Sequence, residues 1–171
     1  MNSVIKLHVK VLDEIITHCN IDKHLECGGY LYGNYKKSFD NQIITINGIY
    51  YEKIFGTENG FNFSPMYKLR AKVKEKEVFR QYGFRLIGCY HSHAEYKAKF
   101  SDVDRKLEMF HYSSNKSALI YSPIDEELIG DIITFNAIHE ARITLINQDE
   151  VERLYFPKIP IKPGKVLALK K

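Results

Sequence analysis

Hydrophobic residues in the first third of the chain change from helical spacing to strand-like runs. Four apolar residues within 12–19 fall at i, i+3, i+4 and i+7, which predicts an amphipathic helix from about His8 to Cys19. The stretches 28–35 and 42–55 are rich in Ile and Tyr and are separated by polar residues. They predict a β-hairpin with a long loop.

Local stop and start signals mark the next two elements. Ser64-Pro65 predicts a helix start, because Ser caps free backbone N–H groups and Pro fits the first helical turn. Gly83 predicts its end, so the helix spans about 65–82. The apolar and aromatic run 84–93 is too short for another helix and predicts a buried central strand.

The following segment predicts a third helix and then more strands. Residues 101–112 begin with Ser101, carry Asp104 three residues later, and have apolar residues at helical spacing. Three further runs with partial alternation predict strands in a meander: 116–122, 127–137 and 140–147. The predicted fold class is mixed α/β.

Composition divides the chain into a body and a tail. With 171 residues, the chain is long enough for one globular domain with its own core. After Glu152 there are six basic residues, no acidic ones and prolines at 157, 160 and 163, so we predict a domain over 1–150 and a basic tail over 151–171. The net charge of +4 comes from this tail, while the body is slightly acidic, and we therefore expect no nucleic-acid partner.

Neither a membrane span nor an exported disulfide framework is expected. No apolar run approaches the roughly 18 residues that a membrane span needs, and the N-terminus lacks signal-peptide features. The three cysteines, Cys19, Cys27 and Cys89, form no CxxC pair and are interpreted as buried reduced thiols. We expect a cytoplasmic location.

A cluster of possible metal ligands follows the predicted central strand. His91 and His93 point to the same face of a strand, and Asp104 lies in the first turn of the next helix. Two imidazoles and one carboxylate suit a zinc ion whose fourth position is open for water. Glu26 is the candidate general base, and Ser101 is a candidate donor to a developing oxyanion.

Each of these residues also has an interpretation without chemistry. An H-x-H pair is common in cores and on surfaces, Glu26 fits a solvated turn, and Ser101 with Asp104 forms a capping box. The combination is more specific. Glu26, His91-Ser92-His93, seven residues, and Ser101 followed by Asp104 resemble the JAMM signature of the JAB/MPN metalloprotease family.

The resemblance covers about residues 1–147 and has several implications. It implies an MPN-type (cytidine-deaminase-like) curved mixed β-sheet flanked by helices, with one Zn²⁺ per chain. His91, His93 and Asp104 would be the metal ligands, with Glu26 and Ser101 catalytic. The implied activity is that of a zinc isopeptidase that cleaves after the C-terminal glycine of a ubiquitin-like protein, as in bacterial stand-alone deubiquitinase-like members.

Two departures from the family pattern lie in the loop between the histidines and the helix. Members often have Pro where this chain has Ala94 and Phe100, which affects loop rigidity more than metal binding. The expected partners are a ubiquitin-like substrate and E1- or E2-like proteins, some of which belong to antiphage operons. Two alternatives stay open: a non-catalytic MPN-like binding scaffold, and a zinc amidohydrolase for small substrates or sulfur-carrier proteins.

Overall fold

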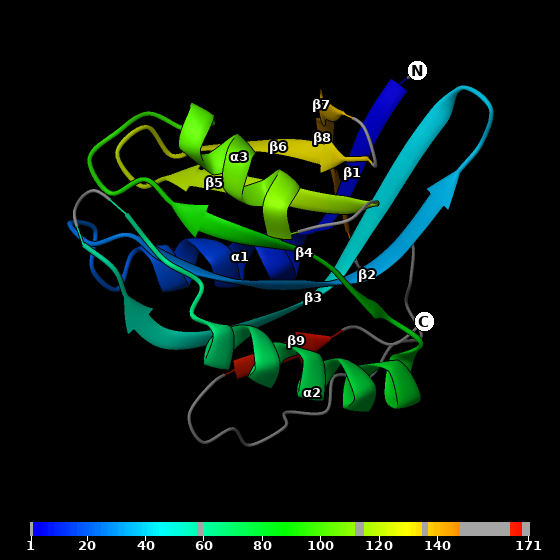
Figure 1. The fold of residues 1–171 in the computed structure, drawn as a ribbon, viewed down its shortest axis with the longest axis horizontal. Helices are drawn as coiled ribbons and strands as arrows, with labels where there is room; N and C mark the ends of the chain where they lie inside the picture. Colours follow the sequence, from blue (N-terminus) through cyan, green and yellow to red (C-terminus); the bar gives the residue numbers. More distant parts are fainter. Residues whose placement is uncertain (1, 58–59, 112–114, 135–136, 148–164, 169–171) are drawn as a thin grey trace.

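The fold is one curved mixed β-sheet with helices on both faces, as Figure 1 shows. The computed structural model describes residues 2–57, 60–111, 115–134, 137–147 and 165–168. The helices are α1 (Val9–Cys19), α2 (Pro65–Tyr82) and α3 (Asp102–His111). The strands are β1 (Asn2–His8), β2 (Cys27–Lys37), β3 (Asn41–Phe55), β4 (Arg85–Ser92), β5 (Lys116–Ser122), β6 (Glu127–Ile133), β7 (Ile138–Glu140), β8 (Arg142–Ile146) and β9 (Lys165–Ala168).

The strand order explains the curvature. The described strands run β7-β6-β5-β4-β2-β3-β1-β8, and β9 pairs with β3. β7 and β8 stand at opposite ends of this order, yet only Ala141 separates them in the chain. The Ala141 N–H donates to the carbonyl of Gly130 on β6, 2.9 Å away. The two edges of the sheet must therefore approach each other, which bends the sheet almost into a barrel.

Most predicted elements are confirmed, and their ends follow the local signals. The Ser64 hydroxyl accepts a hydrogen bond from the Tyr67 N–H at 3.2 Å, which caps α2. Gly83 ends the helix with φ of +72°, a conformation that favours glycine. The β2–β3 hairpin is also confirmed, although its connection, 38–40, is shorter than predicted.

Two expectations about the strands were wrong. No strand was predicted before the first helix, but Asn2–His8 forms β1, which pairs with β3 and β8 in parallel. The expected meander stops early: β7 pairs with β6, and the chain then crosses to β1 as β8. The first strand of this group, β5, pairs in parallel with β4, and α3 forms the crossover between them.

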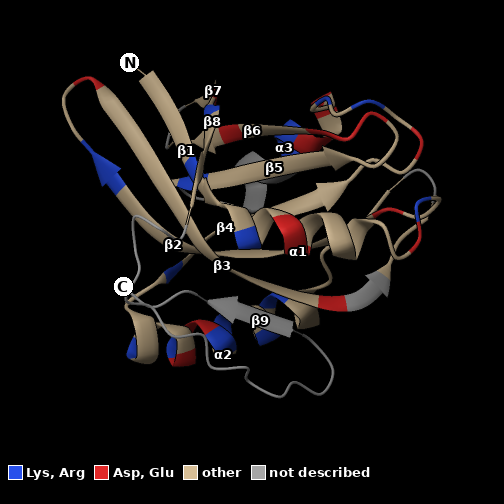
Figure 2. Ribbon diagram, turned by 180° about the vertical axis from the view of Figure 1, so that it is seen from behind, with Lys and Arg blue, Asp and Glu red and all other residues tan. Residues whose placement is uncertain are grey.

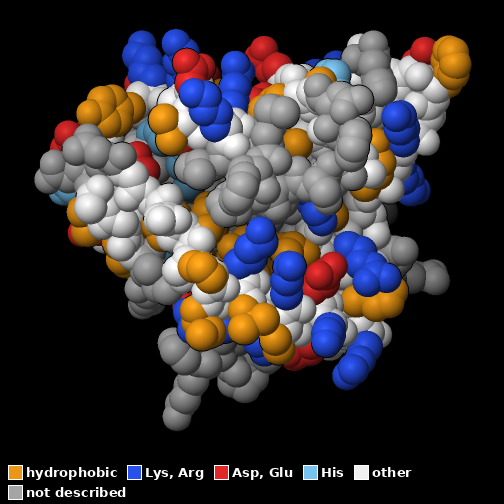
Figure 3. Space-filling view, viewed as in Figure 1, with side chains coloured by type: hydrophobic (Ala, Val, Ile, Leu, Met, Phe, Trp, Pro, Cys, Tyr) orange, Lys and Arg blue, Asp and Glu red, His pale blue; other side chains and the backbone are white. Residues whose placement is uncertain are grey.

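The two faces of the sheet carry different cores. α1 covers a mainly aliphatic cluster, whereas α2 covers a cluster rich in Tyr and Phe. The outer side of α2 is partly apolar, with Met66, Leu69 and Val73 each more than half exposed. Figure 3 shows hydrophobic side chains beside Lys and Arg side chains over this helix, and Figure 2 shows acidic and basic positions interleaved along it.

The C-terminal segment is described only in part. The predicted domain boundary and residues 148–164 lie outside the described residues. Residues 165–168 form β9, antiparallel to Gly48–Tyr51 of β3. This part of the basic tail is therefore paired with the sheet. Among the described residues, no helix has the length and apolar character needed to cross a membrane.

Candidate metal centre

The end of β4 places two histidine side chains on one face of the sheet. β4 lies between β2 and β5, and backbone pairing on both sides fixes its residues in space. His93 follows directly and donates its N–H to the Tyr121 carbonyl at 3.0 Å. Because strand residues alternate, Cys89, His91 and His93 face the aromatic core, whereas Ser92 faces α1.

The start of α3 brings the carboxylate to these histidines. Asp104 donates its N–H to the Ser101 hydroxyl at 3.1 Å, and its Oδ2 accepts from the Ser101 N–H at 2.7 Å. The Ser101 hydroxyl also donates to the same Oδ2 at 2.6 Å. The predicted capping box is thus present, and it holds the Asp104 side chain in a single orientation.

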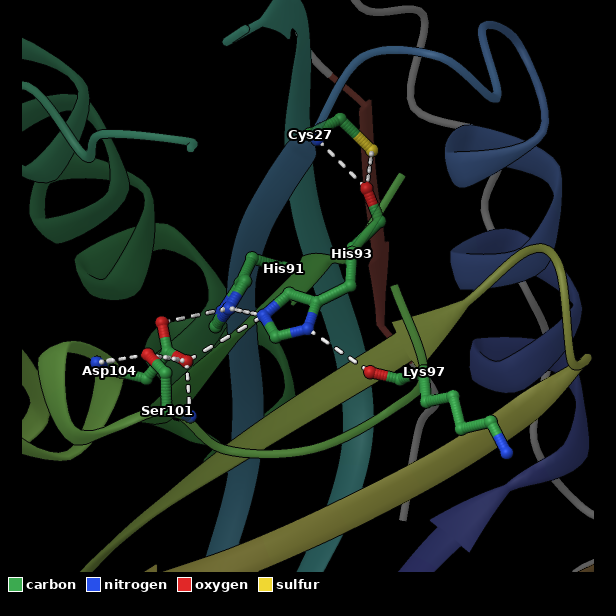
Figure 4. Close-up of polar contacts among 7 residues, drawn as sticks. Cys27, His91, His93, Lys97, Ser101 and Asp104 are labelled. Carbon is green, nitrogen blue, oxygen red and sulfur yellow. Dashed lines mark hydrogen bonds and ion pairs between the residues drawn. The ribbon is translucent and has the colours of Figure 1, made fainter. Parts of the chain in front are cut away.

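The three predicted ligands have the spacing that a zinc ion requires. His91 Nε2 lies 3.3 Å from His93 Nε2 and 3.3 Å from Asp104 Oδ1, and His93 Nε2 lies 3.6 Å from Asp104 Oδ2. Tetrahedral ligands about 2.0–2.1 Å from zinc are roughly 3.3–3.4 Å apart. Figure 4 shows the two rings and the carboxylate facing one another. The residues present fit the metal that the resemblance implies.

Hydrogen bonds and charges around the ligands prepare them for a cation. The Lys97 carbonyl lies 3.3 Å from His93 Nδ1, so a proton on Nδ1 leaves the Nε2 lone pair free for a metal. Burial acts to lower the pKa of His93, but Asp104, together with Glu26 and the Lys97 carbonyl, raises it overall. Burial acts to raise the pKa of Asp104, but His91 and His93 hold it far below its usual value.

Glu26 joins the same site from the start of β2. Its N–H donates to the Thr57 carbonyl at 3.0 Å and its carbonyl accepts from the Gly56 N–H at 2.7 Å, which fixes its backbone beside β3. The residue is only 6% exposed, so it is not the solvated turn residue of the alternative interpretation. Burial raises the pKa of its carboxyl group, while His91 and His93 lower it.

A cavity of about 710 Å³ connects these groups. Its wall contains all five predicted site residues: Glu26, His91, His93, Ser101 and Asp104. The rest of the wall includes the aromatic residues Tyr30, Phe61 and Phe63, together with Cys89 and Lys68. The sequence analysis did not assign these lining residues to the site. The aromatic FNF run before α2 was the available signal.

The loop between the histidines and α3 is anchored without the family prolines. Ala94 is 1% exposed and Phe100 is 6% exposed, so both replacements pack into the interior. Phe100 belongs to the aromatic core cluster. Both ends of the loop are therefore held by buried side chains.

Behind the metal centre lies a thiol cluster that the sequence analysis treated as ordinary core. Ser92, between the two histidines, accepts a hydrogen bond from the Cys27 N–H at 2.9 Å. The sulfur atoms of Cys27 and Cys19 are 3.6 Å apart. All three residues are fully buried.

Comparison with known proteins identifies the family and supports the fold. The family model for prokaryotic homologues of the JAB domain matches residues 8–123, which include all five predicted site residues. The chain belongs to this JAB-domain family. The JAB-domain chain is similar to a Desulfitobacterium hafniense protein solved in solution, with 22% identity and a TM-score of 0.57 over 84% of this chain and 94% of that one. This likeness supports the fold alone. No match is found among curated proteins.

Proposed function

We propose that this protein is a zinc-dependent metallopeptidase that cleaves the peptide or isopeptide bond after the C-terminal glycine of a ubiquitin-like protein. The observation that carries the proposal is the convergence of His91, His93 and Asp104 on one point. Glu26, the candidate base, lies in the same cavity. Membership of the JAB-domain family supports it. A cytoplasmic location and E1- or E2-like partners are further parts of the proposal.

The residues of the site have distinct tasks in such a hydrolysis. A zinc ion, when bound, supplies a Lewis acid and makes a water proton easier to remove. Glu26 accepts this proton and passes it to the departing amine as the C–N bond breaks. One water is consumed, and a carboxylate and an amine are released. The raised pKa of Glu26 suits this exchange, because the buried carboxyl group retains the proton until the amine takes it.

Ser101 has a positioning task as well as the oxyanion task that the resemblance implies. Its hydroxyl donates to Asp104, so it orients a metal ligand in the structure. Donation to an oxyanion requires the hydroxyl to turn from Asp104 toward the cavity. Loss of an oxyanion donor lowers the rate about 100- to 1000-fold. Loss of a helix cap alone costs about 1 kcal/mol of stability.

Ser101→Ala separates these tasks. We expect a 100- to 1000-fold lower kcat with nearly unchanged zinc content, because alanine keeps the backbone N–H that also donates to Asp104 Oδ2. The measurement is kcat together with the zinc bound per chain and the melting temperature. A variant with a lower melting temperature and normal kcat would leave Ser101 as a cap only.

Metal content and a matched pair of substrates test the proposal as a whole. We expect about one zinc per chain, cleavage of a reporter fused after the terminal glycine of a ubiquitin-like protein, and loss of cleavage with a chelator. Protein without zinc and without cleavage would favour the binding scaffold. Zinc-bound protein that cleaves small amides but no fusion would favour the amidohydrolase.

A further inference from the structure

We infer that Cys19 and Cys27 form an oxidation-sensitive dithiol that switches the hydrolytic site off when it closes to a disulfide. The two sulfur atoms lie 3.6 Å apart, eight residues apart in sequence, at the end of α1 and the start of β2. The consequence for hydrolysis rests on the proposed function. The assignment of the modification site rests on the thiol geometry alone.

The surroundings of Cys27 favour it as the attacking sulfur. The Ser92 hydroxyl lies 3.6 Å from its sulfur atom, and His18 lies in the same buried cluster. The Cys19 thiol, His18 and Ser92 lower the pKa of Cys27 to about 5 against the effect of burial, whereas burial raises the pKa of Cys19. A thiolate beside a thiol is the usual arrangement for disulfide formation.

The connection between α1 and β2 links the two buried cysteines and lies at the surface. Both are fully buried in the closed structure, but most residues in 20–25 are exposed or half-buried. Brief opening of such a surface connection admits a small oxidant. Cys89 lies on the other face of the sheet, in the wall of the metal-site cavity, and is the natural control.

The oxidant is a peroxide, such as hydrogen peroxide. The Cys27 thiolate attacks one peroxide oxygen, the O–O bond breaks, and the leaving hydroxide takes a proton to become water. The Cys19 sulfur then attacks the Cys27 sulfenic acid, the S–O bond breaks, and a second water leaves with the thiol proton. Two thiols lose two electrons in total, and one peroxide becomes two waters.

Disulfide formation affects the metal site because Cys27 is adjacent to Glu26. The sulfur atoms must move from 3.6 Å to about 2.05 Å apart, which pulls Cys27 toward α1. Cys27 is bonded to Glu26 and hydrogen-bonded to Ser92, between the two histidine ligands. A shift of Cys27 therefore withdraws the Glu26 carboxylate from the cavity, whereas strand pairing of β4 with β2 and β5 keeps the histidines in place.

The test treats the full zinc-loaded protein with hydrogen peroxide and maps its disulfides by mass spectrometry. We expect a Cys19–Cys27 link, a fall in free thiols from three to one, retained zinc, and at least about tenfold slower cleavage that a reductant restores. Cys19→Ala and Cys27→Ala should abolish the link, and Cys89→Ala should keep it. Because a variant can lose stability, circular dichroism accompanies each measurement.

The outcomes separate this inference from the proposed function. A peroxide-treated protein that retains three thiols, or that links Cys89, overturns the dithiol assignment whatever the enzyme cleaves. A Cys19–Cys27 link with unchanged cleavage overturns the switch. A protein that cleaves no substrate but forms the reversible link supports the modification site and refutes the proposed function.

Discussion

The two faces of the sheet differ in what their buried side chains do. On the α1 face the core is aliphatic and includes Leu31 and Ile46, both fully buried. On the α2 face, buried tyrosines place hydroxyl groups among backbone atoms, as when Tyr32 donates to the Ala71 carbonyl at 2.7 Å. The first face is stabilised by apolar burial, whereas the second also fixes the backbone around a cavity.

Tyr67 illustrates what the aromatic face adds. Its hydroxyl donates to the Gly28 carbonyl at 3.0 Å and accepts from the Glu52 N–H at 3.1 Å. These bonds join α2 to β2 and β3 only two residues from Glu26. The α2 face therefore positions the segment that carries Glu26, while the α1 face mainly supplies the free energy of folding.

The neighbouring residues Ser92 and His93, at the end of β4 and directly after it, give the largest expected contrast. His93→Ala should reduce zinc affinity by more than about 100-fold and abolish cleavage, because it removes a ligand. The free energy of unfolding of the metal-free variant should change by at most about 1 kcal/mol. Zinc titration and chemical unfolding check the two effects. Ser92→Ala is the control on the opposite face and should retain zinc while losing about 1–3 kcal/mol of stability.

The aliphatic face should show the largest effect on folding. Leu31→Ala should lower the free energy of unfolding by about 2–5 kcal/mol, because it leaves a cavity in the core. Zinc bound per folded chain should be unchanged. Tyr32→Phe, the adjacent residue on the other face, should cost only about 1 kcal/mol. Equal losses for the two variants in urea unfolding would remove the distinction between the faces.

Tyr67→Phe should lower the free energy of unfolding by an amount between those for Leu31→Ala and Tyr32→Phe. The ring stays in place, but the Gly28 carbonyl and the Glu52 N–H lose a partner, and we expect a loss of about 1–3 kcal/mol. We also expect lower kcat with unchanged zinc content, since the backbone near Glu26 loses a support. Normal kcat in a destabilised variant would restrict this tyrosine to folding.

The smallest expected effect is a pH dependence of the free energy of unfolding, caused by Asp131 of β6, which lies near Arg105 of α3. Asp131 is 1% exposed, and burial raises its pKa, although Arg105 lowers it. Its contribution to stability is therefore complete below the unfolded pKa of about 3.9 and is lost as pH rises through the folded value. Asp131→Asn should gain stability relative to the wild type as pH rises above about 4. A difference between the two proteins that does not vary with pH would contradict this assignment.

Local signals account for the elements that were predicted. The missed elements have weak local signals or none. The Ser64-Pro65 start and the Gly83 end act within one turn of α2, so the sequence alone locates them. β1 presents only Ile5 and Leu7 as fully buried alternating residues before the helical pattern begins. The crossing at Ala141 depends on pairing with β6 and β1, and no local pattern encodes it.

The candidate site also contains residues that local sequence patterns predict and residues that they do not. The spacing of His91, His93 and Asp104 follows from strand alternation and a helix start, so it was open to direct reasoning. Glu26 is 65 residues away from His91; its charge beside apolar residues made it a candidate base, and the family resemblance supported the assignment, but no local pattern places the two in one cavity. The thiol pair depends on how α1 meets β2, which the sequence pattern does not show.

Glu26→Gln provides the most direct test of the central claim, because it changes a carboxylate that is not a metal ligand. Zinc content and cleavage of the same ubiquitin-like fusion are measured on the variant and the wild type. The account predicts unchanged zinc at about one ion per chain and a loss of kcat of at least about 100-fold. A variant with full zinc content and wild-type kcat would contradict it.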